Sequence, residues 1–258
     1  MELEYGLVEN ALDSLREAMN YYNEGDEEDN ANQYKFSILL SAHCIELLLK
    51  EILRRNHPAL LFENIDSVKD LQDDDNQTVG YKNAIQRVKK LCGVDLKQYE
   101  TYIDELGRVR NQIQHYKCSI NGEYHKQLMA KTFSAIEFIF RDILGLKFED
   151  YENIIEPADI DFLHEDIAAN KARKKDIVKD FEKSENRFRI EYVDGKYLEV
   201  CCPHCGTESL ALESNGKIKC KFCGEEFDNY SELHKADRNC ITQYGILREF
   251  GRRKHLLH

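Results

Sequence analysis

Apolar residues recur every three or four positions through most of residues 1–150, which is the spacing of amphipathic helices. The stretch that begins at Leu3 has this spacing, and we expect its helix to stop at Gly25. The following stretch, about 32–55, is apolar around most of its surface. We therefore expect it to be the central buried helix, which Pro58 ends.

Further helices are expected later in the same region. One should cover about 79–92, with Thr78 or a near neighbour as its cap and Gly93 at its end. Two more should cover about 96–117 and 123–145. Because the connections are short, neighbouring helices are expected to run antiparallel.

The pattern changes beyond residue 150. A helix is expected at 160–184, and its basic run at 171–179 is typical of a solvated connecting helix. The apolar period then falls to two, and hairpins are predicted to turn at 194–195 and at 215–216, which read Asp-Gly and Asn-Gly. The chain is thus predicted to be mainly α, with a helical bundle at 1–150, a connecting helical segment at 151–186, and a small β domain with a C-terminal tail at 187–258.

Composition places the chain among soluble globular proteins. Hydrophobic residues make up 42% and charged residues 33%, and no apolar run reaches the ~18 residues of a membrane span. The acidic start lacks the basic and apolar regions of a signal peptide, so we expect a cytoplasmic protein that does not bind membranes. The net charge is −12, with residues 1–195 at about −13 and 196–258 at about +1. Any nucleic-acid binding must therefore use a local patch.

Six of the nine cysteines fall between residues 201 and 240, and four of them form two Cys-x-x-Cys-Gly motifs. Two residues between cysteines let both thiolates reach one ion, and four thiolates in a tetrahedron suit structural zinc. We therefore predict a structural zinc site with no open ligand position. Its ligands are Cys202, Cys205, Cys220 and Cys223, in an arrangement that resembles a zinc ribbon. The alternative is a zinc finger that includes Cys220, Cys223 and Cys240, but Ala236 stands at its third ligand position, with His234 two residues off. It also leaves Cys202 and Cys205 without a role.

The stretch "RVRNQIQHYK" carries polar residues near the end of the helix expected at 96–117. Its apolar stripe runs from Tyr99 to Ile113 and must face the core. Arg110 lies at the edge of this stripe, about 140° from His115 on an ideal helix. Asn111 and His115 lie across the helix from the stripe. One such face cannot enclose a phosphate, whereas two copies pressed together could.

This helix, following the buried "AHCIELLLKEIL", resembles the HEPN superfamily over roughly residues 1–145. That family consists of helical bundles marked by Arg-x4-6-His, often with a polar residue after the arginine. The match here is Arg110, Asn111 and His115, and Arg108 with His115 is a looser match. The resemblance implies a metal-independent RNA endonuclease whose site is shared across a homodimer. Toxin or antiviral defence roles are common in the family, and so is a loss of catalysis that leaves an interaction module.

The residue types fit RNA cleavage. His115 can move a proton at the 2′-hydroxyl or at the leaving oxygen, and Arg110 can stabilise charge on the phosphorane. Glu46, inside the buried stretch, could pair with Arg110 across the bundle or with Lys50 one turn on. The rival hypothesis is a non-catalytic binding protein that recognises nucleic acid or a protein through its ribbon. The lysines near the ribbon motifs are candidates for that contact; they are Lys217, Lys219 and Lys221.

Overall fold

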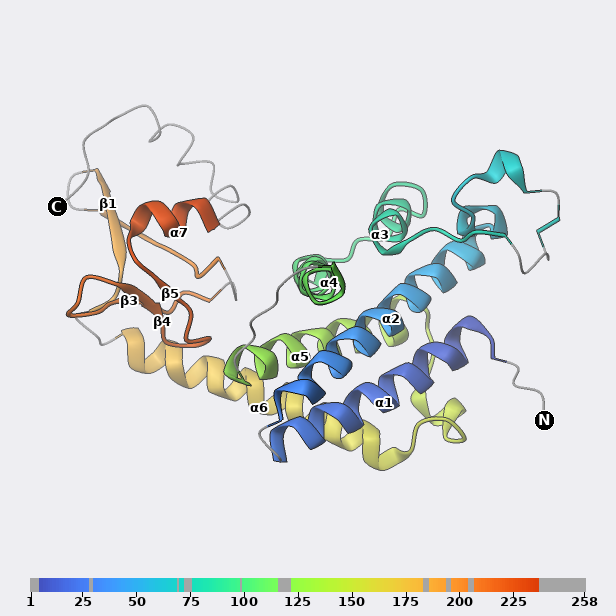
Figure 1. The fold of residues 1–258 in the computed structure, drawn as a ribbon, viewed down its shortest axis with the longest axis horizontal. Coiled ribbons are helices and arrows are strands. Elements are labelled where there is room, and N and C mark those ends of the chain that lie inside the picture. Colours follow the sequence, from blue (N-terminus) through green and yellow to red (C-terminus); the bar gives the residue numbers. More distant parts are fainter. Residues whose placement is uncertain are drawn as a thin grey trace. The chain divides into compact units, whose positions relative to one another are not determined.

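The computed structural model describes residues 5–27, 30–68, 70–71, 76–97, 99–115, 122–182, 186–193, 196–203 and 207–236. It is mainly helical, with a small C-terminal sheet, and it divides into two compact units, 1–167 and 168–258 (Figure 1). None of the helices in the described ranges combines the length and the apolar character needed to cross a bilayer.

Two long antiparallel helices, α1 (Leu7–Glu27) and α2 (Ala31–Asn56), form the base of the first unit (Figure 1). The prediction that α1 stops at Gly25 is wrong by two residues. A Cβ at Gly25 would lie 2.7 Å from the ring of Tyr34, so this glycine permits close packing of α1 on α2 and does not end the helix. The central position of α2 is confirmed, since most of its apolar side chains are buried, among them Ile45, Leu48 and Leu49.

The segment after α2 contains two short 3-10 helices, η1 (Pro58–Leu61) and η2 (Ile65–Ser67). Helix α3 (Tyr81–Lys90) follows. Its N-cap is Gly80, which has no side chain to cap with, and Thr78 instead forms an isolated β-bridge with Phe62. The cap is thus a near neighbour of Thr78, as the second predicted alternative had it, and Thr78 itself pairs the chain to the segment after α2.

Helix α4 (Tyr99–His115) buries the predicted stripe, with Ile103, Leu106 and Val109 nearly inaccessible. Figure 1 looks along the axes of α3 and α4, whereas α1, α2 and α5 lie lengthwise in the same view. The antiparallel arrangement thus holds for α1 and α2, while α3 and α4 cross α2. Helices α3 and α4 lie close to each other because Gly107 of α4 sits against the ring of Tyr81 on α3, whose hydroxyl donates to the Ile103 carbonyl at 2.9 Å.

Helix α5 (Gly122–Glu137) continues as a π-helix, η3 (Phe138–Ile143), and a 3-10 turn, η4 (Phe148–Tyr151), follows it. Helix α6 (Pro157–Glu182) begins with proline at a position where its missing N–H costs nothing. The second unit contains the antiparallel pair β1 (Arg189–Val193) and β2 (Lys196–Glu199), and both flank the predicted 194–195 turn, which lies outside the described residues.

A three-stranded antiparallel sheet completes the second unit. Strands β3 (Leu210–Leu212) and β4 (Ile218–Cys220) form the second predicted hairpin, and Gly216 in its turn has a φ of 82°. Strand β5 (Glu226–Phe227) and helix α7 (Tyr230–Ala236) were not predicted, because both are too short to show a period.

Candidate functional site

Three of the four predicted metal ligands lie together in the second unit. Cys202, Cys220 and Cys223 are buried, and their sulfur atoms all lie within 4.8 Å of one another. The fourth predicted ligand, Cys205, lies outside the described residues. The position of Cys202 beside Cys220 and Cys223 favours the four-cysteine site over the alternative zinc finger, which leaves Cys202 without a role. Cys240 of that finger also lies outside the described residues.

The spacing of the sulfur atoms fits a metal rather than a disulfide. Cys202 Sγ and Cys223 Sγ are 3.7 Å apart, far beyond the S–S bond of about 2.05 Å. Two ligands of a tetrahedral zinc, each at about 2.3 Å, lie about 3.8 Å from one another. The three cysteines could therefore hold one metal ion without moving the backbone.

The surroundings of Cys220 suit a thiolate. The Cys223 backbone N–H donates to Cys220 Sγ at 3.4 Å, and the turn that aims it continues into Gly224, whose φ is 76°. Two buried hydroxyls also lie near this sulfur, Ser209 Oγ at 3.3 Å and Thr207 Oγ1 at 3.7 Å. Because the two are 2.8 Å apart, one hydroxyl hydrogen joins them and the other can donate to the sulfur. Donors around a buried sulfur stabilise its negative charge and are the usual outer partners of a metal ligand.

The second candidate site lies at the end of α4. Arg110 is half-buried at the edge of the apolar stripe, and Asn111 and His115 are exposed. The Arg110 guanidinium donates to Asn111 Oδ1 at 3.1 Å through Nη1. His115 is the last residue of α4, two turns or less from Arg110, and it has no described partner in the bundle. The helix thus presents all three predicted residues at one accessible end.

Glu46 connects this helix end to α2. Both partners considered from the sequence lie near its carboxylate. Oε1 is 2.8 Å from Lys50 Nζ, and Oε2 is 4.0 Å from Arg110 Nη2. The Lys50 pair is the tight one, and both of its side chains are nearly buried, at 11% and 16% exposed. Glu46 is thus neutralised chiefly by Lys50, which leaves most of the Arg110 charge for another anion.

A histidine that sequence analysis missed completes the cluster. His43 lies one turn before Glu46 on α2, and its Nδ1 is 2.9 Å from Ser14 Oγ on α1. Partial burial lowers the pKa of His43; Glu46 opposes this shift, and Lys50 and Arg110 add to it. The i, i+3 spacing of His43 and Glu46 was visible in the sequence, but the approach of α4 to that face was not.

The ribbon lysines are less available than expected. Each contacts a carboxylate of its own unit: Lys217 with Asp228 at 2.9 Å, Lys219 with Glu226 at 2.7 Å, and Lys221 with Glu213 at 2.5 Å. Exposed pairs of this kind contribute little to stability, but they cancel the charge that a phosphate would meet. The hairpin is therefore a weaker candidate for RNA contact than its sequence indicates.

Cysteines elsewhere in the chain carry no comparable cluster among the described residues. Burial raises the pKa of the Cys44 thiol far above its ordinary range, which makes it an inert core residue, and Cys92 is half-buried with a raised pKa for the same reason. Comparison with known proteins adds no assignment, because no family model, curated protein or solved structure matches the chain.

Proposed function

We propose that the chain is a metal-independent endoribonuclease of HEPN type, active as a homodimer, with Arg110, Asn111 and His115 as its catalytic residues. The observation that carries this proposal is the state of Arg110. Its guanidinium is oriented by Asn111 at 3.1 Å, yet its only described carboxylate lies at 4.0 Å and is shared with Lys50. An oriented cation that is not neutralised suits an anion that arrives from outside the chain.

In this proposal the chemistry uses the nucleophile that RNA itself carries. His115 takes a proton from the 2′-hydroxyl or gives one to the leaving 5′-oxygen, since an imidazole can act as a base or as an acid. Arg110 donates two hydrogen bonds to the phosphorane oxygens as their charge develops. The bond from the 2′-oxygen to phosphorus forms as the bond to the 5′-oxygen breaks, leaving a 2′,3′-cyclic phosphate. The 2′-hydroxyl gives its proton to a general base, and the leaving 5′-oxygen takes one from a general acid; His115 makes one of these transfers, and water or the His115 of the second copy makes the other.

The three cysteines are proposed to bind one structural zinc ion together with Cys205. When bound, the ion would hold the short strands of the second unit in place, since so small a sheet buries little apolar surface of its own. It takes no part in the proposed cleavage.

Cleavage of a fluorescent RNA tests the function. His115→Ala and Arg110→Ala are expected to lower the rate by at least about 100-fold, the scale of a lost general acid–base or oxyanion contact. Arg110→Lys should rescue poorly, because a point charge cannot make paired hydrogen bonds. A 2′-deoxy nucleotide at the scissile position should block cutting, and short exposure to EDTA should not.

Arg108→Ala is the matched control, since it removes the same charge two residues away. The Arg108 guanidinium lies 3.3 Å from Tyr124 Oη and 3.4 Å from Gln112 Oε1, so it faces α5 and its own helix. It should leave cleavage within a few-fold of wild type. Wild-type rates in the Arg110→Ala, His115→Ala double variant would refute the assignment.

The competing function is a non-catalytic interaction module. The strong negative charge favours it, because an acidic chain repels RNA at long range. A wild-type chain that dimerises but cuts no RNA under any condition would favour this alternative. A strict monomer at micromolar concentration, with or without RNA, would count against a shared site.

A further inference from the structure

Lysines gather along one side of α6 in the second unit. Lys171, Lys175 and Lys179 follow one another at intervals of four residues, so they share a helix face at steps of about 6 Å. Lys174 adjoins them, and all four side chains are exposed. We call these four residues the lysine row.

The lysine row differs from the described lysines at 217–221 in having no paired carboxylate. Among the side chains that the structure describes, no carboxylate pairs with any of the four, whereas each lysine of the β3–β4 hairpin has one within 2.9 Å. Asp180 projects from the far side of α6, and Asp176 neighbours only Lys179 at the end of the row, with no ion pair between their described side chains. Among the described side chains, the row is therefore a line of positive charge without a paired carboxylate.

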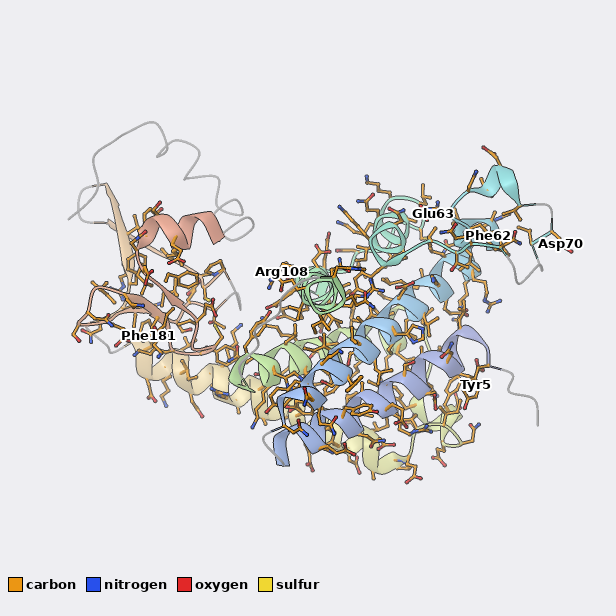
Figure 2. All side chains as sticks on the ribbon, in the orientation of Figure 1. Tyr5, Phe62, Glu63, Asp70, Arg108 and Phe181 are labelled. Atoms are coloured by element: carbon orange, nitrogen blue, oxygen red, sulfur yellow. The ribbon has the colours of Figure 1, made fainter. Side chains whose placement is uncertain are left out.

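Like charges four residues apart destabilise a helix by about 0.2–0.5 kcal/mol per pair, so the row is unfavourable while nothing binds it. Two other positions of α6 contact the rest of the unit. Arg173, on the side opposite the row, lies 5.7 Å over the ring of Phe222, and Phe181, two turns after Lys174, is buried beneath the guanidinium of Arg187, 5.8 Å from its ring centre. Figure 2 labels Phe181 on this helix. Phe181 is thus buried within its own unit and is not available for insertion into a membrane.

The distribution of charge favours a polyanion at this unit. Residues 168–258 hold 18 Lys and Arg against 15 Asp and Glu, whereas residues 1–167 hold 18 against 33. The ribbon lysines of the same unit are largely neutralised by their pairs. An extended chain of phosphates thus finds its most favourable described contact along the lysine row.

We propose that the lysine row binds the phosphodiester backbone of a single RNA strand. Ammonium groups at regular steps contact phosphates as point charges and read no bases, so the row would hold RNA of any sequence. The proposal rests on the function above only for the choice of RNA as the polymer. It stands even if Arg110 and His115 cut nothing.

Fluorescence anisotropy of the full chain with a labelled 20-nucleotide 2′-O-methyl RNA tests the row, because this RNA binds but lacks the hydroxyl that cleavage requires. The triple variant Lys171→Gln, Lys175→Gln, Lys179→Gln removes three charges and keeps good helix formers. Its affinity should fall about tenfold or more at 0.1 M salt. The slope of log K against log salt should shrink by about 2, since each phosphate contact on a single strand contributes about 0.7.

The triple variant Lys217→Gln, Lys219→Gln, Lys221→Gln is the matched control, with the same charge removed from the same unit. It should keep the wild-type slope, and its affinity should stay within about threefold. Equal losses in both variants, or none in the first, would overturn the proposal, as would a wild-type chain that binds no RNA. Tighter binding of polyglutamate of equal charge, lost in the first variant, would assign the row to an acidic protein instead.

Discussion

Replacing His125 should remove a pH-dependent weakness from the helical unit. This histidine is fully buried on α5, and its ring stacks on that of Tyr34 with 4.0 Å between centres. Its Nε2 lies 2.7 Å from Ser37 Oγ. Because the Ser37 hydroxyl donates to the Tyr34 carbonyl at 3.0 Å, it accepts from His125, and the neutral Nε2–H tautomer fits this network.

Protonation of His125 would put a positive charge in the core, with no described hydrogen-bond acceptor for the second ring N–H. Its Nδ1 is buried and has no hydrogen-bond partner in the described residues. Burial is the main reason that the pKa falls from 6.5 to about 3, and Lys126 adds to it. The folded pKa thus lies below the unfolded one, so the unfolded chain binds the extra proton between these values.

The sign follows from this difference. Stability is complete above about pH 6.5 and is lost as the pH falls toward 3, at up to about 1.4 kcal/mol per pH unit. Between pH 7.5 and pH 5 the loss is about 2 kcal/mol, and its ceiling near pH 3 is about 5 kcal/mol. His125→Leu removes the titrating group, while Ser37 keeps its bond to the Tyr34 carbonyl. The variant should lose stability at pH 7.5 but lack this part of the pH dependence.

Urea unfolding followed by ellipticity at 222 nm, at pH 7.5 and pH 5, measures the effect. The stability difference between wild type and His125→Leu should shrink by about 2 kcal/mol at the lower pH. Comparing the two chains cancels titrations that they share, including any loss of metal from the cysteines. Phe133→Leu, whose ring packs edge-on against Tyr22 near His125, serves as the control and should keep the wild-type dependence. Equal pH dependence in wild type and His125→Leu would refute the reasoning.

Three other predictions follow from single contacts. Gly107→Ala should destabilise the first unit by about 1–3 kcal/mol, because the new Cβ would lie 2.7 Å from the Tyr81 ring. Gly80→Ala, whose Cβ would have no atom within 4 Å, should lower stability by only a few tenths of a kcal/mol. Thermal unfolding of the two variants compares these losses. Cys202→Ser should reduce bound zinc, measured by elemental analysis after dialysis, to well below one ion per chain. Glu51→Gln should lower the free energy of unfolding by about 2–4 kcal/mol at pH 7, measured by chemical unfolding, and by less in acid. The reason is that two arginines lower the pKa of this buried carboxyl. An equal loss of stability at both pH values would contradict the prediction.

Much of the fold follows from local sequence. The helical period located α1, α2, α4 and α6 to within a few residues, and Asn215-Gly216 located the β3–β4 turn. Gly25 was misread because a glycine signals a helix end and a close contact equally well. Only the Tyr34 ring, which reaches it from another helix, decides between the two.

A site could be predicted from the sequence where the spacing of its residues along the chain already brings them together. Cys-x-x-Cys places two thiolates within reach of one ion through local geometry, and Cys202, Cys220 and Cys223 duly lie together. The pairing of the hairpin lysines depends instead on the register of β3, β4 and β5, which no local motif records. The sequence alone therefore could not distinguish the lysines at 217–221, which have carboxylate partners, from the lysine row, which has none in the described residues.

Arg110 and the lysine row are both proposed as RNA contacts because of how little their charge is paired within the chain. In a chain with net charge −12, most basic side chains are expected to form ion pairs with carboxylates of the same chain, as Lys50 does with Glu46 and Lys219 with Glu226. A cation without a close carboxylate partner is the exception among the described residues. Arg110, half-buried and 4.0 Å from Glu46, and the exposed lysine row differ in geometry: one oriented guanidinium suits a single phosphate at a reacting bond, and a line of ammonium groups suits an extended strand. If the lysine-row variant lowers RNA affinity without changing the rate of cleavage at saturating RNA, while Arg110→Ala does the reverse, holding and cutting are separate functions of separate units.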